Sequence, residues 1–256
     1  MTETITPASR STSARNGPAL SERGESKGLV ARAIGVLTSP RATYAAVAAQ
    51  PRWLGMLVLI VLAGGIAFTA LMSTDVGQRA FMNQAMARAD ASGRTLTDAQ
   101  IQGVERMAGV FKYAVIPVQF VFVGFGSLLI SAIVLAIFSA MLGGDASFRQ
   151  VFAIVVHSGV ILTLGGLFAL PLNYAREALS SPTTLAVFLP MLDENSFPAR
   201  LAGAFDLFRI WWTISLAIGL GVLYRKRTAP IATTLLVVYA VIALVYAAAT
   251  AALAGA

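Results

Sequence analysis

The strongest constraint on this fold is a series of long stretches without charged side chains. From Trp53 to Met72, for example, every residue is uncharged and most are apolar. A helix of ~20 apolar residues crosses the ~30 Å hydrocarbon core of a bilayer, and a water-soluble core does not need blocks of this length. We therefore predict an all-α, polytopic membrane protein, a bundle of about five transmembrane helices. The spans are expected at about residues 53–72, 113–142, 148–172, 204–224 and 231–253.

The composition agrees with this interpretation. Hydrophobic residues make up 57% of the chain and charged residues 12%, whereas about a quarter of an ordinary soluble domain is charged. The formal charge of +7 could suggest nucleic acid. However, the basic residues flank the predicted spans and do not form one stripe with interleaved aromatic residues. We therefore predict the lipid bilayer as a partner and no nucleic-acid partner.

The region before the first span divides into a tail and two short helices. Residues 1–28 are rich in Ser, Thr, Arg, Glu and Gly, and this composition predicts a disordered cytoplasmic tail. Apolar residues at helical spacing follow from Leu29. Ser39 followed by Pro40 indicates a break and a restart, because proline suits the first position of a helix. We expect two interfacial helices in residues 29–50, with helices packed on the spans as the alternative.

Two long polar connections separate some of the spans. In the first, residues 73–112, Thr97 and Gln100 form a capping-box pair that predicts the start of a helix. The second, residues 173–203, contains an apolar stretch at 185–192. This stretch is too short to cross a bilayer, so we expect it to be interfacial or re-entrant.

The basic residues also predict the orientation, because Lys and Arg accumulate in cytoplasmic loops close to span ends. Seven of them precede the first span, and Arg225, Lys226 and Arg227 fill the last turn. With five spans, both groups lie on one side, although the first connection carries five Lys or Arg residues opposite them. We predict a cytoplasmic N-terminus and an external C-terminus in a bacterial inner membrane, since abundant Ala and Arg suggest a GC-rich bacterial genome.

Three polar residues within the predicted spans are candidate functional positions. His157 lies deep in the third span, where an ionisable side chain could serve a proton relay or ion path. No other span has a charged residue near its middle, which favours a neutral histidine bonded to a neighbouring helix near Ser158. Asp206 and Arg209 are three residues apart on one helix face and could pair. An orientation lock is favoured over a substrate site for this pair.

The sequence predicts no catalytic, cofactor-binding or metal site, and no enzyme. Asp193 and Glu194 are adjacent carboxylates without convergent partners, and we interpret them as a solvated loop tip. The chain has no cysteine and no motif typical of nucleotide binding or hydrolysis. Glycines such as Gly124 and Gly219 are interpreted as positions where helices pack closely.

Three stretches carry a resemblance to a known family. They are residues 37–44 with 50–53, residues 142–151, and residues 206–211 with the basic turn 225–227. The most characteristic residues in them are Pro40, Gly143, Gly144, Phe148 and Trp211. In these stretches the chain resembles the bacterial branch of the Yip family, the Ypt-interacting-protein membrane proteins.

The resemblance implies a Yip-like five-span membrane domain over residues 29–254 with a cytoplasmic N-terminus. Eukaryotic members are associated with Rab GTPases, vesicle traffic and membrane shaping, and no catalytic residues come with the resemblance. Our first hypothesis is a non-enzymatic protein that organises the membrane or recruits a protein partner at the cytoplasmic face. The alternative is a transporter or channel for a small solute or an ion, which predicts a continuous polar cavity.

Overall fold

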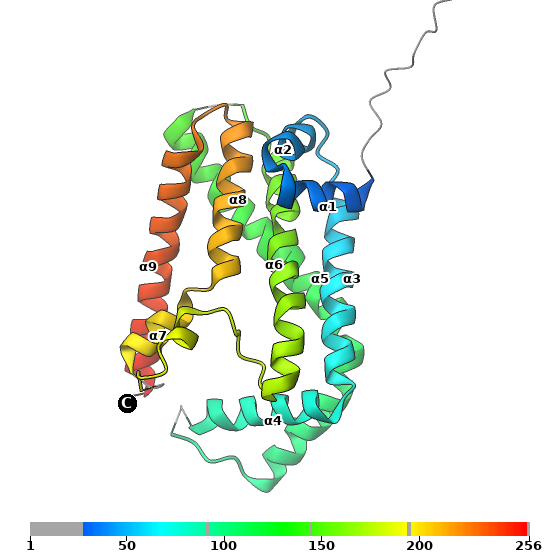
Figure 1. Ribbon diagram of the computed structural model, residues 1–256, viewed down its shortest axis with the longest axis vertical. Coiled ribbons are helices and arrows are strands. Elements are labelled where there is room, and N and C mark those ends of the chain that lie inside the picture. Colours follow the sequence, from blue (N-terminus) through cyan, green and yellow to red (C-terminus); the bar gives the residue numbers. More distant parts are fainter. Residues whose placement is uncertain (1–27, 91–92, 144, 194–195, 255–256) are drawn as a thin grey trace, which may run out of the picture.

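The structure is a computed structural model that describes residues 28–90, 93–143, 145–193 and 196–254. Every regular element in these ranges is a helix, which confirms the predicted all-α class. In chain order the elements are α1 (Leu29–Thr38), α2 (Pro40–Ala49), α3 (Leu54–Met72), α4 (Asp75–Asp90), α5 (Asp98–Leu142), α6 (Phe148–Arg176), η1 (Leu185–Phe188), α7 (Phe197–Ala204), α8 (Leu207–Leu223) and α9 (Thr228–Ala254). The long helices stand side by side, with α1 and α4 across opposite ends (Figure 1). The tail predicted at residues 1–28 lies, up to residue 27, outside the described residues.

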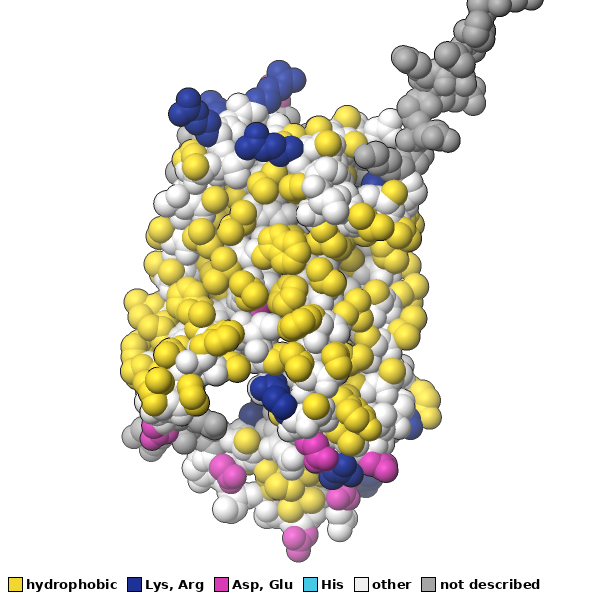
Figure 2. Space-filling view, in the orientation of Figure 1, with side chains coloured by type: hydrophobic (Ala, Val, Ile, Leu, Met, Phe, Trp, Pro, Cys, Tyr) yellow, Lys and Arg dark blue, Asp and Glu magenta, His cyan; other side chains and the backbone are white. Residues whose placement is uncertain are grey.

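Four helices in the described part of the chain, α3, α5, α6 and α9, are long and apolar enough to cross a membrane. The shorter apolar helix α8, of 17 residues, lies between α6 and α9 (Figure 1). Hydrophobic side chains cover the middle of the face in Figure 2, while charged side chains gather mainly toward its two ends. Such a belt matches the hydrocarbon region of a bilayer, so the chain is an integral, polytopic membrane protein.

Capping boxes open the two longest membrane helices. At the start of α5, the Thr97 hydroxyl accepts from the Gln100 N–H at 3.4 Å, and the Gln100 amide oxygen accepts from the Thr97 N–H at 3.0 Å. This confirms the predicted pair, and Ser147 with Gln150 forms a second box before α6. The helix from Thr97 does not stop before the predicted span. Instead, α5 continues as one helix of 45 residues, about 67 Å long, obliquely behind the bundle (Figure 1).

The central helix of the bundle is α6, which packs against α3, α5 and α8. The core on its α8 side contains Tyr44 of α2, Ile154 of α6 and Leu220 of α8, all fully buried. Gly219 permits this approach, since an added Cβ would lie 2.5 Å from Ile154 Cγ2 and 3.2 Å from the Tyr44 ring. Gly124 differs from the packing expectation, because no atom lies within 4 Å of a Cβ placed there.

The two N-terminal helices are separated where the sequence predicts, with Pro40 opening α2. Tyr44 attaches α2 to α8, because its buried hydroxyl is 2.7 Å from Ser215 Oγ of α8. The neighbouring α1 packs against α3 and α6 but leaves Val30 62% and Ile34 53% exposed. Thus α2 follows the packed alternative, whereas α1 keeps the outward apolar side expected of an interfacial helix.

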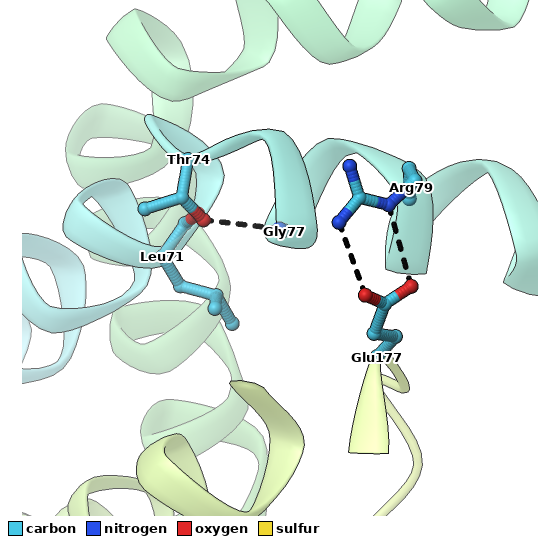
Figure 3. A network of polar contacts seen from close by, with 5 residues as sticks. All are labelled: Leu71, Thr74, Gly77, Arg79 and Glu177. Carbon is cyan, nitrogen blue, oxygen red and sulfur yellow. Dashed lines mark hydrogen bonds and ion pairs between the residues drawn. The ribbon is translucent and has the colours of Figure 1, made fainter. Parts of the chain in front are cut away.

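At the opposite end, α4 is tied to the end of α6 by an ion pair. The Arg79 guanidinium donates to the Glu177 carboxylate from Nε at 3.3 Å and from Nη2 at 3.0 Å (Figure 3). These hydrogen bonds, together with the opposite charges, lower the pKa of Glu177 and raise the pKa of Arg79. Before them, the Thr74 hydroxyl accepts from the Gly77 N–H at 3.1 Å (Figure 3). The pair orients α4 but contributes little stability, because both side chains are about half exposed.

Candidate functional site

The site begins at an interruption between α7 and α8. The helix predicted over residues 204–224 begins at Leu207, and a non-helical segment separates it from α7, which ends at Ala204. The Tyr239 hydroxyl of α9 donates to the Ala204 carbonyl at 2.7 Å and accepts from the Asp206 N–H at 3.3 Å. Tyr239 lies about 16 Å along α9 from its first residue. The interruption therefore lies beside the middle of α9, which is one of the candidate spans.

Backbone groups at the interruption find partners in the connection that precedes α7. The Leu185 N–H donates to the Phe205 carbonyl at 2.9 Å, and the Leu207 N–H donates to the Thr183 carbonyl at 3.1 Å. These bonds form a short antiparallel bridge between the two segments. Non-helical backbone at membrane depth is tolerated only where protein or a water-filled cavity satisfies it. This connection, between α6 and α7, supplies the partners and thus makes the interruption possible.

Asp206 is the side chain on which both segments converge. One carboxylate oxygen, Oδ1, accepts from the N–H groups of Phe208 at 2.9 Å and Arg209 at 3.2 Å, which caps α8. The other, Oδ2, accepts from the hydroxyls of Ser181 and Thr183, both at 2.6 Å. The residue is only 6% exposed, and the helix N-terminus favours its negative charge. Asp206 therefore fixes the start of α8 against the connection 177–183.

Arg209 is not paired as the sequence suggested. Its backbone N–H contacts the Asp206 carboxylate, but its guanidinium makes no ion pair with Asp206 and no hydrogen bond within the described part of the chain. The Arg209 side chain is exposed. The hydroxyls of Ser181 and Thr183, which take the role expected of Arg209, were not predicted. They lie more than twenty residues away in the sequence, and no local pattern links them to Asp206.

His157 is fully buried in α6. Its Nδ1 lies 2.7 Å from the Ala153 carbonyl oxygen of the same helix, and since a carbonyl only accepts, Nδ1 carries the hydrogen. Nε2 then remains an acceptor without a partner among the described residues. The bond to a neighbouring helix comes from the next residue, because Trp212 Nε1 donates to Ser158 Oγ at 2.9 Å.

An open crevice of about 760 Å³ adjoins the interruption. Its walls come from α3, α5, α6, α8 and the connection after α6, and we call it the α6 crevice. Its lining on α6 extends from Val155 to Asn173, about 27 Å of helix. Asp206 and Arg209 are its charged lining residues, and His157 is not part of the lining. Figure 2 shows an opening in the lower half of the face, below the hydrophobic middle.

Helix α2 connects two of the three stretches that carry the family resemblance. Pro40 opens α2, Gly143 ends α5 with φ of 57°, Phe148 opens α6, Trp211 lies on α8, and Gly144 is outside the described residues. Gln150 Nε2 donates to the Ala48 carbonyl at 3.0 Å, which joins the turn between α5 and α6 to α2. Tyr44 joins α2 to Ser215 of α8. The first two stretches therefore build one scaffold at the α2 end of the bundle, whereas Trp211 lies near the start of α8, close to the interruption.

A metal centre finds no support in the described ranges, which contain no group of three or more His, Cys, Asp or Glu residues that could hold an ion. Asp193 is described, whereas its neighbour Glu194 lies outside the described residues.

The helices, the surface elements at both ends and the α6 crevice define a multi-pass helical membrane protein. The family model for the Yip1 domain matches residues 34–250. The chain belongs to this family, which confirms the resemblance at the level of the Yip family. Searches of curated proteins and of solved structures found no significant match.

Replacing the carboxylate at the interruption should destabilise the fold. In Asp206→Ala, α8 loses its N-cap and two hydroxyls lose their acceptor. We expect the free energy of unfolding to fall by about 2–4 kcal/mol. Reversible unfolding of the purified protein in detergent micelles measures this change.

Ser147→Ala is the matched control, because Ser147 caps α6 at an exposed position. The free energy of unfolding of this variant should fall by only about 1 kcal/mol. Equal losses for the two variants would mean that Asp206 acts only as a helix cap and does not hold the connection 177–183.

Proposed function

We propose that this Yip1-domain protein is a non-enzymatic membrane protein that organises the bilayer and recruits partners through a platform formed by α1 and α2. The observation that carries this proposal is the apolar outer side of α1. Leu29, Val30 and Ile34 are 39%, 62% and 53% exposed although they are large and apolar. In a bilayer this surface would enter the boundary between headgroups and acyl chains.

The platform is suited to act as a rigid wedge. A free amphipathic helix can tilt or leave the membrane, but α1 continues into α2, and α2 is fixed by the buried contact between Tyr44 and Ser215. The Gln150 side chain holds the end of α2 in addition. When α1 inserts into one leaflet, it is therefore held rigidly by the bundle.

The surface helix α4, at the opposite end of the bundle, has no equivalent apolar side among its described residues. Among the large apolar residues of α4, Met86 is the exposed one, at 39%. The rest of the outer side of α4 carries polar and charged residues such as Asp75 and Arg79. Exposed apolar side chains at that end lie instead on and after η1, such as Phe188 at 72%, so the proposal depends on the rigid attachment of α1 and not on an asymmetry between the leaflets.

We further propose that the platform faces the cytoplasm of a bacterial cell and that α8 is the fifth span. The N-terminal helices and the end of α9 lie at opposite ends of the bundle (Figure 1), which is expected for an odd number of crossings. The turn with Arg225, Lys226 and Arg227 lies at the same end as α2 (Figure 1), as the positive-inside rule requires. These cations would favour a protein partner with an acidic surface.

The orientation can be tested with single cysteines, because the chain contains none. We expect an impermeant thiol reagent to label Thr95→Cys and Ser180→Cys in intact cells. Gly28→Cys and Thr228→Cys should react only after the membrane is opened. The reverse pattern would contradict the proposed orientation, and labelling of all four positions from one side would contradict five crossings.

The wedge can be tested with the double variant Val30→Asn/Ile34→Asn. Purified wild-type protein, reconstituted into vesicles of mixed size, should be enriched in the smaller and more curved ones. The double variant should lose most of this enrichment, because its α1 no longer inserts an apolar side. Fluorescence of single vesicles measures protein density against vesicle diameter.

Met86→Asn/Met107→Asn is the matched control, since both methionines are exposed and lie toward the α4 end. This variant should keep the wild-type enrichment. If the control loses as much enrichment as the α1 variant, general loss of apolar surface explains the result and the wedge is ruled out.

Transport of a small solute or an ion is a second candidate. It is supported by the interruption between α7 and α8, because discontinuous helices frame the binding sites of many transporters. Transport needs a water path to both faces. A cysteine at Thr163, which lines the α6 crevice, would then react with an impermeant reagent applied from either side. Reaction from one side only, or none, favours the membrane-organising role.

A further inference from the structure

The guanidinium of Arg209 lies in a setting that calls for an anion. Arg209 lines the α6 crevice, and its guanidinium has no hydrogen bond or ion pair to the described residues. The preceding residue, Phe208, packs on Gly165 of α6, where an added Cβ would meet the Phe208 ring. Gly165 is about 12 Å of helix away from Asn173, where the crevice ends on α6. A cation at this depth is costly without a counter-charge or water.

The crevice itself does not supply the counter-charge. Its charged lining residues are Asp206 and Arg209, and both oxygens of the Asp206 carboxylate are already occupied by four donors. Gln119, on the α5 wall, presents an amide without a hydrogen bond in the described part of the chain. Two polar groups that favour an anionic or polar ligand therefore remain available in the crevice.

The remaining walls suit a hydrocarbon chain. From the level of Gly165 toward α2, the lining continues along α6 to Val155, about 15 Å further. Ile60 of α3 and Ile130 of α5 line this part as well. At the edge of the crevice, Phe122 is 74% exposed, so the crevice is open toward the surrounding bilayer. A lipid could enter sideways without crossing water.

We propose that the α6 crevice binds one anionic glycerophospholipid, with its phosphate on Arg209 and an acyl chain along the apolar wall toward α2. A guanidinium can donate two parallel hydrogen bonds to a phosphate. Both oxygens of the Asp206 carboxylate already accept hydrogen bonds, so the crevice offers no free anion to the ammonium group of phosphatidylethanolamine. The site should therefore favour phosphatidylglycerol. This site goes beyond the proposed wedge and does not depend on it.

The glycines of the crevice offer a direct test. No atom lies within 4 Å of a Cβ added at Gly166 or Gly126, and both glycines line the crevice. Gly166 adjoins Gly165, at the level of Arg209, so Gly166→Leu should fill the space beside the phosphate, where the acyl chain begins, without disturbing the fold. Gly109→Leu is the matched control, because Gly109 also has no atom within 4 Å and does not line the crevice.

The experiment is a titration of the full-length protein in detergent with phosphatidylglycerol, followed by native mass spectrometry. Wild type should bind one phosphatidylglycerol at least about tenfold more tightly than phosphatidylethanolamine. Arg209→Gln should weaken phosphatidylglycerol binding by at least about tenfold, as expected when a charge-assisted hydrogen bond is lost. Gly166→Leu should weaken it similarly, while Arg227→Gln and Gly109→Leu should bind as wild type does.

Equal binding by Arg209→Gln and Arg227→Gln would overturn the assignment of the phosphate to Arg209. Unchanged binding by Gly166→Leu would overturn the placement of the lipid in the α6 crevice. Unfolding curves of all four variants without added lipid should match wild type, which separates loss of binding from loss of fold. The curvature enrichment of Arg209→Gln should also stay at the wild-type level, so failure of the lipid site and failure of the wedge are distinguishable.

Discussion

The shape of this membrane domain depends on the hydrogen bonds that the Asp206 carboxylate accepts. This carboxylate stabilises a helix start inside the bundle, where an uncapped N-terminus would leave unsatisfied N–H groups in a medium without water. It also holds the hydroxyls of Ser181 and Thr183, and with them the chain that returns from the end of α6. Because α8 begins only at Leu207, no continuous helix fills the space before its start, and the α6 crevice results.

The sequence predicts those features that depend on local spacing. The membrane helices follow from apolar blocks, the capping box before α5 from Thr97 and Gln100, and the start of α2 from Pro40. The interruption before α8 was not predictable in this way, because Leu201 to Phe205 is as apolar as a span and local pattern cannot reveal a turn within it. Its cause is the contact of Asp206 with hydroxyls far away in the sequence. Likewise, Gly219 and Gly124 have the same local signal, and only the neighbouring helices decide that Gly219 is packed.

The two ends of the domain and its interior serve different tasks in this account. At one end, α2 joins two of the family-characteristic stretches into a scaffold and holds α1 with its apolar side outward. In the interior, Arg209 stays available because Asp206 is engaged with backbone and hydroxyl groups. The buried His157 belongs to neither region, and its packed side chain is consistent with a structural role. In the proposed function, α1 and the α6 crevice both act on lipids.

The depth of the helix start is the most direct test of this account. A nitroxide attached to Leu207→Cys, an exposed position at the first residue of α8, reports its depth in reconstituted bilayers through collisions with oxygen and with a water-soluble nickel reagent. Leu54→Cys, at the start of α3, serves as the reference near the platform end. We predict that the label at position 207 lies in the hydrocarbon interior, clearly deeper than the label at position 54. A label at headgroup depth at position 207 would contradict the account, because α8 would then begin at the membrane surface.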